Sequence, residues 1–340
     1  MLKISHIHVS DKKNKGDVGI VLSVQDILRE RFGDIEIIDH PVEVLKSYDP
    51  KTLNDINGSD MVIIGGGGIF YRYFMPFDLK MIRLITAPIV IFGVGYIREI
   101  GSKKMSQADV QSIIGLNNKA SLIGVRDYYT KAFLVKNGIP SEKIDLVGDQ
   151  AVFLEEKKPD GLMLENGVKL GLNLNYSGWL GFGNWEMDIL RAYRETAAFF
   201  KNEYGASIYY CMHHPDEKNI ISKLDIPGMQ ILDFDAYGQK YAYAQLDLII
   251  GMMLHSCVMA FGALTPEINV AYDLRNKNFA RFIHCPELCV NLENLKEEAL
   301  LESAKNVFNN KDAYRHKFAK RKESIKRSAD RFLDKTIKLL

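Results

Sequence analysis

The sequence predicts an α/β protein made of two Rossmann-like domains that face a cleft. Strand and helix patterns alternate along both halves of the chain, and such alternation implies parallel strands joined by crossover helices. The glycine run at residues 65–68 and the segment 251–255, which ends in His255, each follow an apolar strand, where open α/β sheets place ligands. At 340 residues the chain is also longer than one core usually sustains.

The first domain is expected over residues 1–156. A short strand at residues 4–9 leads into a helix at 17–31, whose apolar residues recur at helical spacing. Extended runs and helical segments then alternate. The predicted strands are 35–38, 61–64, 89–92, 121–125 and 144–147, and the predicted helices are 77–84, 105–116 and 127–136.

The second domain is expected over residues 162–310, after a polar stretch at 155–161 that is the best linker candidate. Apolar runs and helical patterns alternate again, so a second sheet with parallel strands is predicted. The predicted strands are 169–174, 207–212, 229–232, 246–250 and 267–271, and the predicted helices are 186–200, 236–244 and 254–262.

A basic amphipathic helix is expected over residues 311–340, where eleven Lys or Arg residues stand against four Asp or Glu residues. Phe318, Ile325, Phe332 and Leu339 recur at seven-residue steps and form one apolar stripe. We favour a closing helix that packs on the domains and keeps a solvated basic face. The alternative is peripheral contact with anionic lipid at the inner face of the membrane.

Composition excludes several classes of protein. A net charge of +1 provides no strongly basic surface, so nucleic acid is not an expected partner. The first residues enter a strand pattern without the features of a secretory signal, and no run approaches the roughly 18 apolar residues of a membrane span. The cysteines lack a C-x-x-C pair and are expected to be reduced thiols, which indicates the cytoplasm.

Two glycine-bearing segments of the first domain can approach a ligand. Gly16 permits a tight turn after the first strand, and Asp17 either caps the helix or accepts a proton from a bound hydroxyl. The run at 65–68 can present backbone N–H groups as an anion-binding nest. It lacks the Lys-Ser/Thr of a Walker loop, and Gly93-Val94-Gly95 does not complete a dinucleotide fingerprint, so no cofactor is expected.

Arg126 ends a strand, at a place where a guanidinium can bind a carboxylate or phosphate through two hydrogen bonds. Asp127 follows it and is expected to cap the next helix. The structural alternative is an Arg–Asp pair that pins the loop. Asp149 follows the next strand and either orients Arg126 or faces a substrate hydroxyl.

The second domain contributes histidines. His213 and His214 follow a strand, but neither has the i, i+4 partner of a helical zinc pair, so no metal site is expected. His255 stands at the start of a helix, where backbone N–H groups and the helix dipole favour an anion. The alternative for His255 is a structural histidine whose hydrogen bonds are satisfied.

These motifs, taken in order, resemble the polysaccharide pyruvyl transferase family over about residues 10 to 280. The matching elements are Asn14-x-Gly16-Asp17, Gly65-Gly66-Gly67-Gly68-Ile69-Phe70, Gly93-Val94-Gly95, Val125-Arg126-Asp127, Gly148-Asp149, Leu254-His255 and Tyr272-x-x-x-x-Lys277. The resemblance implies a GT-B-like arrangement, with the acceptor on the first domain and the donor on the second. It also implies transfer of pyruvate from phosphoenolpyruvate to two hydroxyls of a sugar, which forms a ketal.

The resemblance further implies roles for single residues. His255 is expected to be the acid, and Asp17 or Asp149 is expected to take the hydroxyl proton. The acceptor is expected to be a sugar or lipid-linked saccharide of cell-surface glycan biosynthesis. The residues implied at the donor are Arg126, Leu254, His255, Arg275 and Lys277, and those implied at the acceptor are Asn14, Gly66, Gly67, Gly68, His213 and His214.

One position departs from the family pattern. The family has Arg-Leu-His where this chain has Met253-Leu254-His255, and Met cannot replace a bidentate cation. Either Arg275 compensates or the donor site is weakened. Two other functions therefore stay open. One is a GT-B-type glycosyltransferase, for which Glu267 is a poor candidate as the acidic ribose clamp, and the other is a noncatalytic glycan-binding relative.

Overall fold

The computed structural model of the protein describes residues 1–98, 102–176 and 182–340. Within these residues the chain forms two compact units, each with a six-stranded parallel sheet. The first unit comprises Met1–Asp11, Ile20–Gln150 and Glu323–Leu340, and the second comprises Lys12–Gly19 and Ala151–Lys322. The predicted α/β class with two Rossmann-like halves is confirmed, although neither unit is one continuous stretch of sequence.

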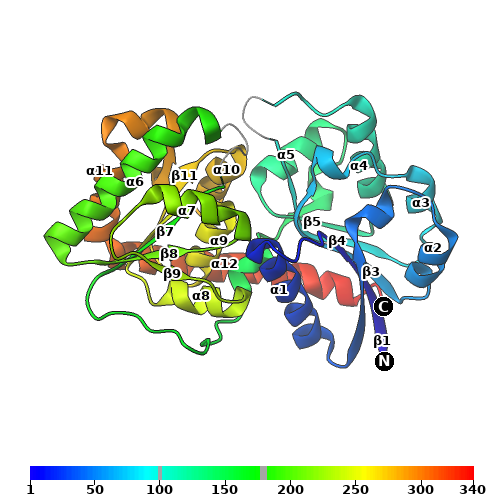
Figure 1. The fold of residues 1–340 in the computed structure, drawn as a ribbon. Helices are drawn as coiled ribbons and strands as arrows, with labels where there is room; N and C mark the ends of the chain where they lie inside the picture. The colour runs from blue at the N-terminus through cyan, green and yellow to red at the C-terminus, as the bar shows by residue number, and fades with distance from the viewer. Residues whose placement is uncertain (99–101, 177–181) are drawn as a thin grey trace. The chain divides into compact units, whose positions relative to one another are not determined.

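The sheet of the first unit has the strand order β2-β1-β3-β4-β5-β6. Its strands are β1 (Leu2–His8), β2 (Ile35–Pro41), β3 (Met61–Phe70), β4 (Ile89–Tyr96), β5 (Leu122–Val125) and β6 (Ile144–Leu146), and its helices include α1 (Lys15–Phe32), α2 (Pro50–Asn57), α3 (Leu79–Leu84), α4 (Gln107–Lys119) and α5 (Tyr128–Lys136). Every neighbouring pair of these strands is parallel. Helices lie on both faces of the sheet (Figure 1), so its central strands are apolar and buried.

The sheet of the second unit has the order β12-β11-β10-β7-β8-β9. Its strands are β7 (Lys169–Asn173), β8 (Ser207–Cys211), β9 (Gln230–Leu232), β10 (Leu248–Gly251), β11 (Glu267–Ala271) and β12 (Cys289–Asn291), and its helices include α6 (Phe182–Tyr204), α7 (Lys218–Leu224), α8 (Ala236–Ala244), α9 (Leu254–Gly262), α10 (Leu274–Phe282) and α11 (Ala299–Asn309). The strands β7 and β10 are neighbours at the centre of this sheet. From β7 the chain adds strands β8 and β9 on one side, and from β10 it adds β11 and β12 on the other side. Ligands bind at such switch points, outside the carboxyl ends of the strands.

Strand β3 extends farther than the sequence pattern predicts. The predicted strand stops at Ile64, but β3 continues through the glycine run to Phe70, with an irregularity in its pairing between Gly67 and Phe70. Glycine weakens a strand because it has no side chain to pack. The low strand propensity of four consecutive glycines therefore predicts that the strand ends before them. Pairing with β4 on one side overrides that local preference.

The predicted C-terminal helix is α12 (Lys311–Ile337). Phe318, Ile325 and Phe332 are each at most 2% exposed. Phe318 packs edge-on against Phe261 in the second unit, and Phe332 stacks on Phe92 in the first. Most of the apolar stripe is thus covered by protein, which supports the closing-helix interpretation over lipid contact. Within the described residues, no helix is long and apolar enough to cross a membrane.

Candidate active site

The cap of helix α1 differs from the sequence prediction. The Asn14 side chain accepts hydrogen bonds from the backbone N–H groups of Gly16 (3.0 Å) and Asp17 (3.4 Å), so Asn14 is the capping residue. The expectation that Asp17 caps this helix is wrong, because the helix begins at Lys15 and Asp17 lies in its first turn. Capping therefore does not explain the carboxylate at this position.

Gly16 places the start of α1 against His255 within the second unit. His255 lies in the first turn of α9 and is 8% exposed. A Cβ atom on Gly16 would overlap the His255 ring, so only glycine lets the imidazole lie this close to the helix backbone. The segments Asn14-x-Gly16-Asp17 and Leu254-His255, which are far apart in the sequence, therefore meet at the first turns of two helices.

Lys15 fixes the same segment to the carboxyl ends of β8 and β9. Its ammonium donates hydrogen bonds to the Met212 carbonyl oxygen (2.6 Å) and to the Asp233 carboxylate (2.6 Å). Its backbone N–H donates to the His213 carbonyl oxygen (3.0 Å). Sequence analysis missed Lys15 because it lies among other lysines in a polar loop, where no periodicity or spacing distinguishes it.

His213 is fully buried beside this segment. Burial lowers the pKa of its imidazole well below the ordinary value, and the charges of Lys15 and His255 lower it further. Its Nε2 contacts the Tyr243 hydroxyl. The buried, neutral His213 ring is therefore part of the packing near His255. Contact of His213 with an acceptor stays a prediction.

His214 and Glu217 close the loop that follows β8. The Nδ1 atom of His214 accepts a hydrogen bond from the Asp216 N–H (3.1 Å), so His214 acts as a cap. The Glu217 carboxyl accepts from the N–H groups of His213 (3.0 Å) and His214 (2.6 Å) and from the Tyr210 hydroxyl (2.9 Å). Burial raises the pKa of Glu217 to about 8, although these hydrogen bonds oppose the shift. Sequence analysis missed Glu217, and the predicted acceptor role of His214 remains untested.

Arg275 is a predicted donor residue of the second unit, and the charge of Asp17 acts on it. Its Nη2 forms an ion pair with the Asp273 carboxylate (3.0 Å) and donates a hydrogen bond to the Tyr272 hydroxyl (3.2 Å), and its side chain is 18% exposed. Loss of solvation opposes its charge, but Asp273, and to a lesser degree Asp17, raise the pKa of the guanidinium. Asp273 and Tyr272 thus fix the position of the Arg275 guanidinium, which remains partly accessible to solvent. Lys277 lies farther along the same helix, α10, and is partly buried.

Met253 immediately precedes α9, at the position where the sequence resemblance leads us to expect an arginine. It is 8% exposed, and its backbone N–H donates to the Asn173 side chain (3.0 Å). Its side chain makes no capping hydrogen bond. The departure therefore leaves the first turn of α9 without a side-chain cation from that position.

Arg126 lies in the first unit between two carboxylates. Its Nη1 is 3.3 Å from Asp149 and its Nε is 3.5 Å from Asp127. Asp127 also accepts from the Thr130 N–H (2.7 Å), which confirms that it caps α5. The guanidinium is 4% exposed and lies against Gly95, where a Cβ would approach it to 2.5 Å. This geometry supports the structural-pair interpretation, and donor binding by Arg126 stays a prediction.

The glycine run is explained in large part by packing. Gly66 and Gly67 have positive φ angles of 73° and 75°, which favour glycine. A Cβ on Gly66 would overlap Ile20 of α1, and a Cβ on Gly68 would overlap Ile97. The predicted end of the strand at Ile64 is wrong, because these residues belong to β3, and the first three glycines are buried. Contact of Gly66, Gly67 and Gly68 with an acceptor therefore remains only a prediction.

Comparison with known proteins decides the family. The sequence profile of the family described as polysaccharide pyruvyl transferase matches residues 14–273, which is most of the chain. The chain belongs to the polysaccharide pyruvyl transferase family. The match includes the Asn14 segment, Arg126, His255 and Asp273, and it ends before Arg275 and Lys277. No curated protein matches the chain.

The fold of this family member is similar to that of nucleotide-sugar enzymes. UDP-GlcNAc 2-epimerase from Neisseria meningitidis bound to UDP-GlcNAc has a TM-score of 0.58 at 12% identity, over 99% of this chain and 100% of that chain. MnaA from S. aureus in complex with UDP has a TM-score of 0.60 at 13% identity, over 94% and 91%. HepE from Anabaena with UDP and glucose has a TM-score of 0.54 at 12% identity, over 98% and 100%. At such identities these likenesses establish a GT-B-like fold.

Proposed function

We propose that this pyruvyl transferase family member transfers pyruvate from phosphoenolpyruvate to two hydroxyls of a saccharide and releases phosphate. The observation that supports this most strongly is the contact between Gly16 and His255 within the second unit. It places a histidine beside the Asn14-x-Gly16-Asp17 segment, and the Asp17 charge acts on Arg275 in the same unit. The second unit therefore supplies a histidine, a carboxylate and a cation for this reaction.

The donor is an anion with two charged groups, and the second unit offers complementary charge. The first turn of α9 carries Leu254 and His255 and presents backbone N–H groups that favour a phosphate or carboxylate. Arg275 and Lys277 of α10 add cations. Arg126 of the first unit is also predicted to bind the donor, and its Nη2 has no hydrogen-bond partner among the described residues.

The reaction balances with the groups named. His255 gives a proton to the methylene carbon of phosphoenolpyruvate, which becomes a methyl group and leaves oxocarbenium character at C2. A sugar hydroxyl attacks C2, and Asp17 takes its proton. The second hydroxyl then forms the other C–O bond of the ketal as the bond between C2 and the phosphate oxygen breaks. One hydroxyl proton restores His255, and the other leaves with phosphate.

A nucleotide-sugar glycosyltransferase is the second candidate, because the chain shares its fold with proteins solved in complex with UDP or UDP-sugars. The structure does not support Glu267 as the acidic residue that would bind the ribose of a nucleotide sugar. Glu267 lies in β11 with 0% exposure, and burial raises the pKa of its carboxyl to about 8. A side chain with no exposed surface cannot contact the ribose of a nucleotide bound at the protein surface.

Thermal unfolding with each donor separates the two candidates. A ligand that binds only the folded protein raises the unfolding temperature as its concentration rises. We expect phosphoenolpyruvate to raise the midpoint and UDP-glucose and UDP-GlcNAc to leave it unchanged, with inorganic sulfate at equal ionic strength as the control. Stabilisation by the UDP-sugars alone would favour the glycosyltransferase, and stabilisation by a saccharide alone would favour a glycan-binding protein.

A further inference from the structure

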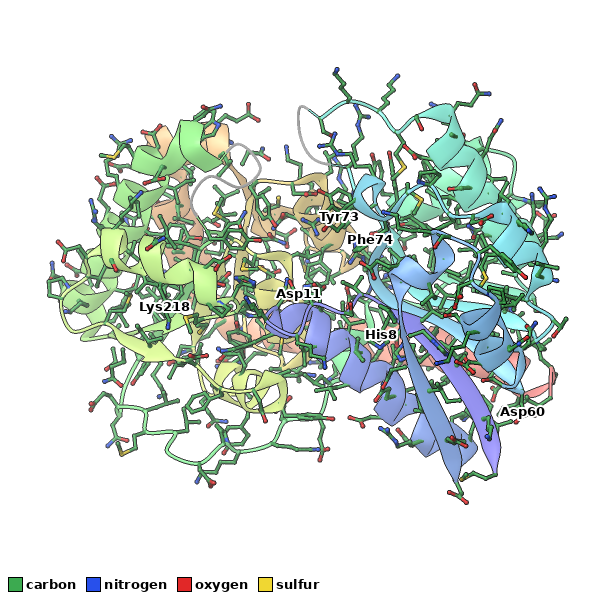
Figure 2. All side chains as sticks on the ribbon, turned by 45° about the vertical axis from the view of Figure 1, so that its right-hand side comes forward. His8, Asp11, Asp60, Tyr73, Phe74 and Lys218 are labelled. Carbon is green, nitrogen blue, oxygen red and sulfur yellow. The ribbon has the colours of Figure 1, made fainter. Side chains whose placement is uncertain are left out.

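The first unit holds a cluster of two histidines and an aspartate that the proposed function does not use. His6 and His8 lie two residues apart on β1, so their side chains project from the same face of the sheet. Asp39 lies on the neighbouring strand β2, directly opposite His6. One ligand atom of each side chain lies within 4.8 Å of the others. Figure 2 shows His8 near helix α1, close to the end of its strand.

The separations within the cluster suit a bound metal ion. His8 Nε2 lies 3.1 Å from Asp39 Oδ1, and His6 Nδ1 lies 3.9 Å from the same oxygen. Nitrogen and oxygen ligands bind Zn²⁺ at about 2.0–2.2 Å in tetrahedral geometry, which sets neighbouring ligand atoms roughly 3.3–3.6 Å apart. The first separation is slightly shorter than this range and the second slightly longer, and the two histidine nitrogens lie within 4.8 Å of each other, so a bound ion needs only side-chain adjustment.

The protonation of His8 leaves an electron pair directed at a carboxylate. His8 Nδ1 lies 2.8 Å from the Val9 carbonyl oxygen, which can only accept, so Nδ1 carries the proton. The other ring nitrogen, Nε2, faces Asp39 Oδ1 at 3.1 Å. A metal ion at this place could be bound by both atoms.

His6 supplies the second, independent observation. It is 0% exposed, and neither of its ring nitrogens makes a hydrogen bond of normal geometry among the described residues, although the Gly65 backbone lies close to the ring. A buried polar atom without a partner destabilises a fold, so its retention needs a reason. A Cβ on Gly65 would lie 2.7 Å from His6 Nε2, so the first glycine of the run makes room for this ring.

The surroundings also fit a metal site. Gln25 of α1 donates a hydrogen bond to Asp39 Oδ1 (2.7 Å) and thereby orients the carboxylate, as outer-shell partners of metal ligands do. The Asp39 side chain is 57% exposed, so an ion can enter from solvent. Two imidazoles and one carboxylate form a nitrogen-rich set that suits Zn²⁺ and related first-row ions better than Mg²⁺ or Ca²⁺.

We propose that His6, His8 and Asp39 bind one divalent transition-metal ion, with Zn²⁺ as the best-suited ion and water at the fourth position. Sequence analysis missed this site because it combines two histidines at i and i+2 on one strand with a carboxylate on the neighbouring strand. The sequence-based expectation of no metal considered only helical i, i+4 pairs. The proposal is independent of pyruvyl transfer.

Metal binding to the full-length chain tests the proposal. The protein is stripped with a chelator, dialysed, and titrated with Zn²⁺ by calorimetry, and in parallel with Co²⁺ by visible absorption. We expect one tight Zn²⁺ per chain and the strong Co²⁺ absorption of a four-coordinate site. If the wild-type protein binds no stoichiometric Zn²⁺, the assignment is wrong.

Matched variants locate the ion. Asp39→Ala, at an exposed side chain, is expected to keep its fold by circular dichroism and to lose the tight site, and His8→Ala is expected to lose it as well. Gln25→Ala should weaken Zn²⁺ binding by about 10–100-fold, as the loss of an outer-shell partner does. His316→Ala removes an exposed histidine of α12 and should change nothing. Wild-type affinity in Asp39→Ala would overturn the proposal.

Discussion

At the scale of single residues, the proposed site depends most directly on the absence of a side chain at Gly16. The His255 ring occupies the space that a Cβ would take, and this contact joins the first turns of α1 and α9. Any side chain at position 16 must therefore displace the ring, the helix, or both. Gly19 offers a comparison within the same helix, because a Cβ there would meet Leu154 at an ordinary 3.4 Å.

Gly16→Ala is expected to lower the rate of pyruvyl transfer by roughly 10²-fold or more, since a displaced acid loses most of its contribution to proton transfer. Gly19→Ala should leave the rate unchanged and slightly stabilise the helix, by up to about 1 kcal/mol. Steady-state rates and thermal midpoints of both variants provide the check. Equal activity of the two would show that the position of His255 against Gly16 is irrelevant to catalysis.

Met253 is the second residue that tests the proposed donor site, because the sequence resemblance leads us to expect an arginine at this position. Met253→Arg is expected to tighten phosphoenolpyruvate binding modestly, since the new guanidinium would stand at the first turn of α9. Met163→Arg adds the same charge at a residue that is 82% exposed and should have no effect. Calorimetric titration compares them. No gain in Met253→Arg would place the donor anion elsewhere.

At the scale of elements, β11 carries a buried acid that makes stability depend on pH. Burial raises the pKa of Glu267 from 4.5 to about 8, against a small opposing effect of Cys257. The folded state therefore holds this proton more tightly than the unfolded state. Its contribution is favourable below about pH 4.5 and is lost as pH rises towards 8, with a slope of at most about 1.4 kcal/mol per pH unit.

Glu267→Gln should flatten this part of the pH dependence. The amide stays neutral, so the variant is expected to gain stability relative to the wild type as pH rises from 5 to 8. Denaturant unfolding at several pH values measures the difference. Glu217 also has a pKa raised to about 8 by burial, but it is present in both proteins and cancels in the comparison. Parallel curves would show that Glu267 does not titrate in this range.

Local pattern predicted several elements of the second unit with their bounds. The predicted segments 236–244, 254–262 and 267–271 are α8, α9 and β11, because each apolar run there ends at a turn or polar residue. The cap of α1 and the extension of β3 escaped prediction. A cap depends on which residue begins the helix, and β3 depends on pairing with β4, so neither is determined by local sequence.

At the scale of the whole molecule, the two units exchange segments of chain. Residues 12–19 belong to the second unit although they lie within the first half, and Glu323–Leu340 belong to the first unit. Hydrophobic periodicity describes which face of an element is buried, but not which sheet buries it. The family motifs could therefore be identified from the sequence, whereas the meeting of Gly16 with His255 required the structure.

This exchange predicts that α12 stabilises both units. Phe332 packs on Phe92 in the first unit, and Phe318 packs on Phe261 in the second. Each Phe→Ala substitution is expected to cost about 3–5 kcal/mol, because it leaves a cavity in a buried core. Hydrogen exchange should report the loss in the first unit for Phe332→Ala and in the second for Phe318→Ala. Unchanged protection in both variants would show that α12 contributes little to either core.

Phosphate release tests the central claim most directly. The wild type and His255→Ala are incubated with phosphoenolpyruvate and galactose- or mannosamine-type saccharides, and phosphate and the ketal product are measured together. We predict phosphate release by the wild type only when an acceptor is present, with one ketal per phosphate, and a rate about 10²–10⁴-fold lower for a folded His255→Ala. A wild type that releases no phosphate with any acceptor, or a His255→Ala variant of equal rate, would contradict the proposed reaction.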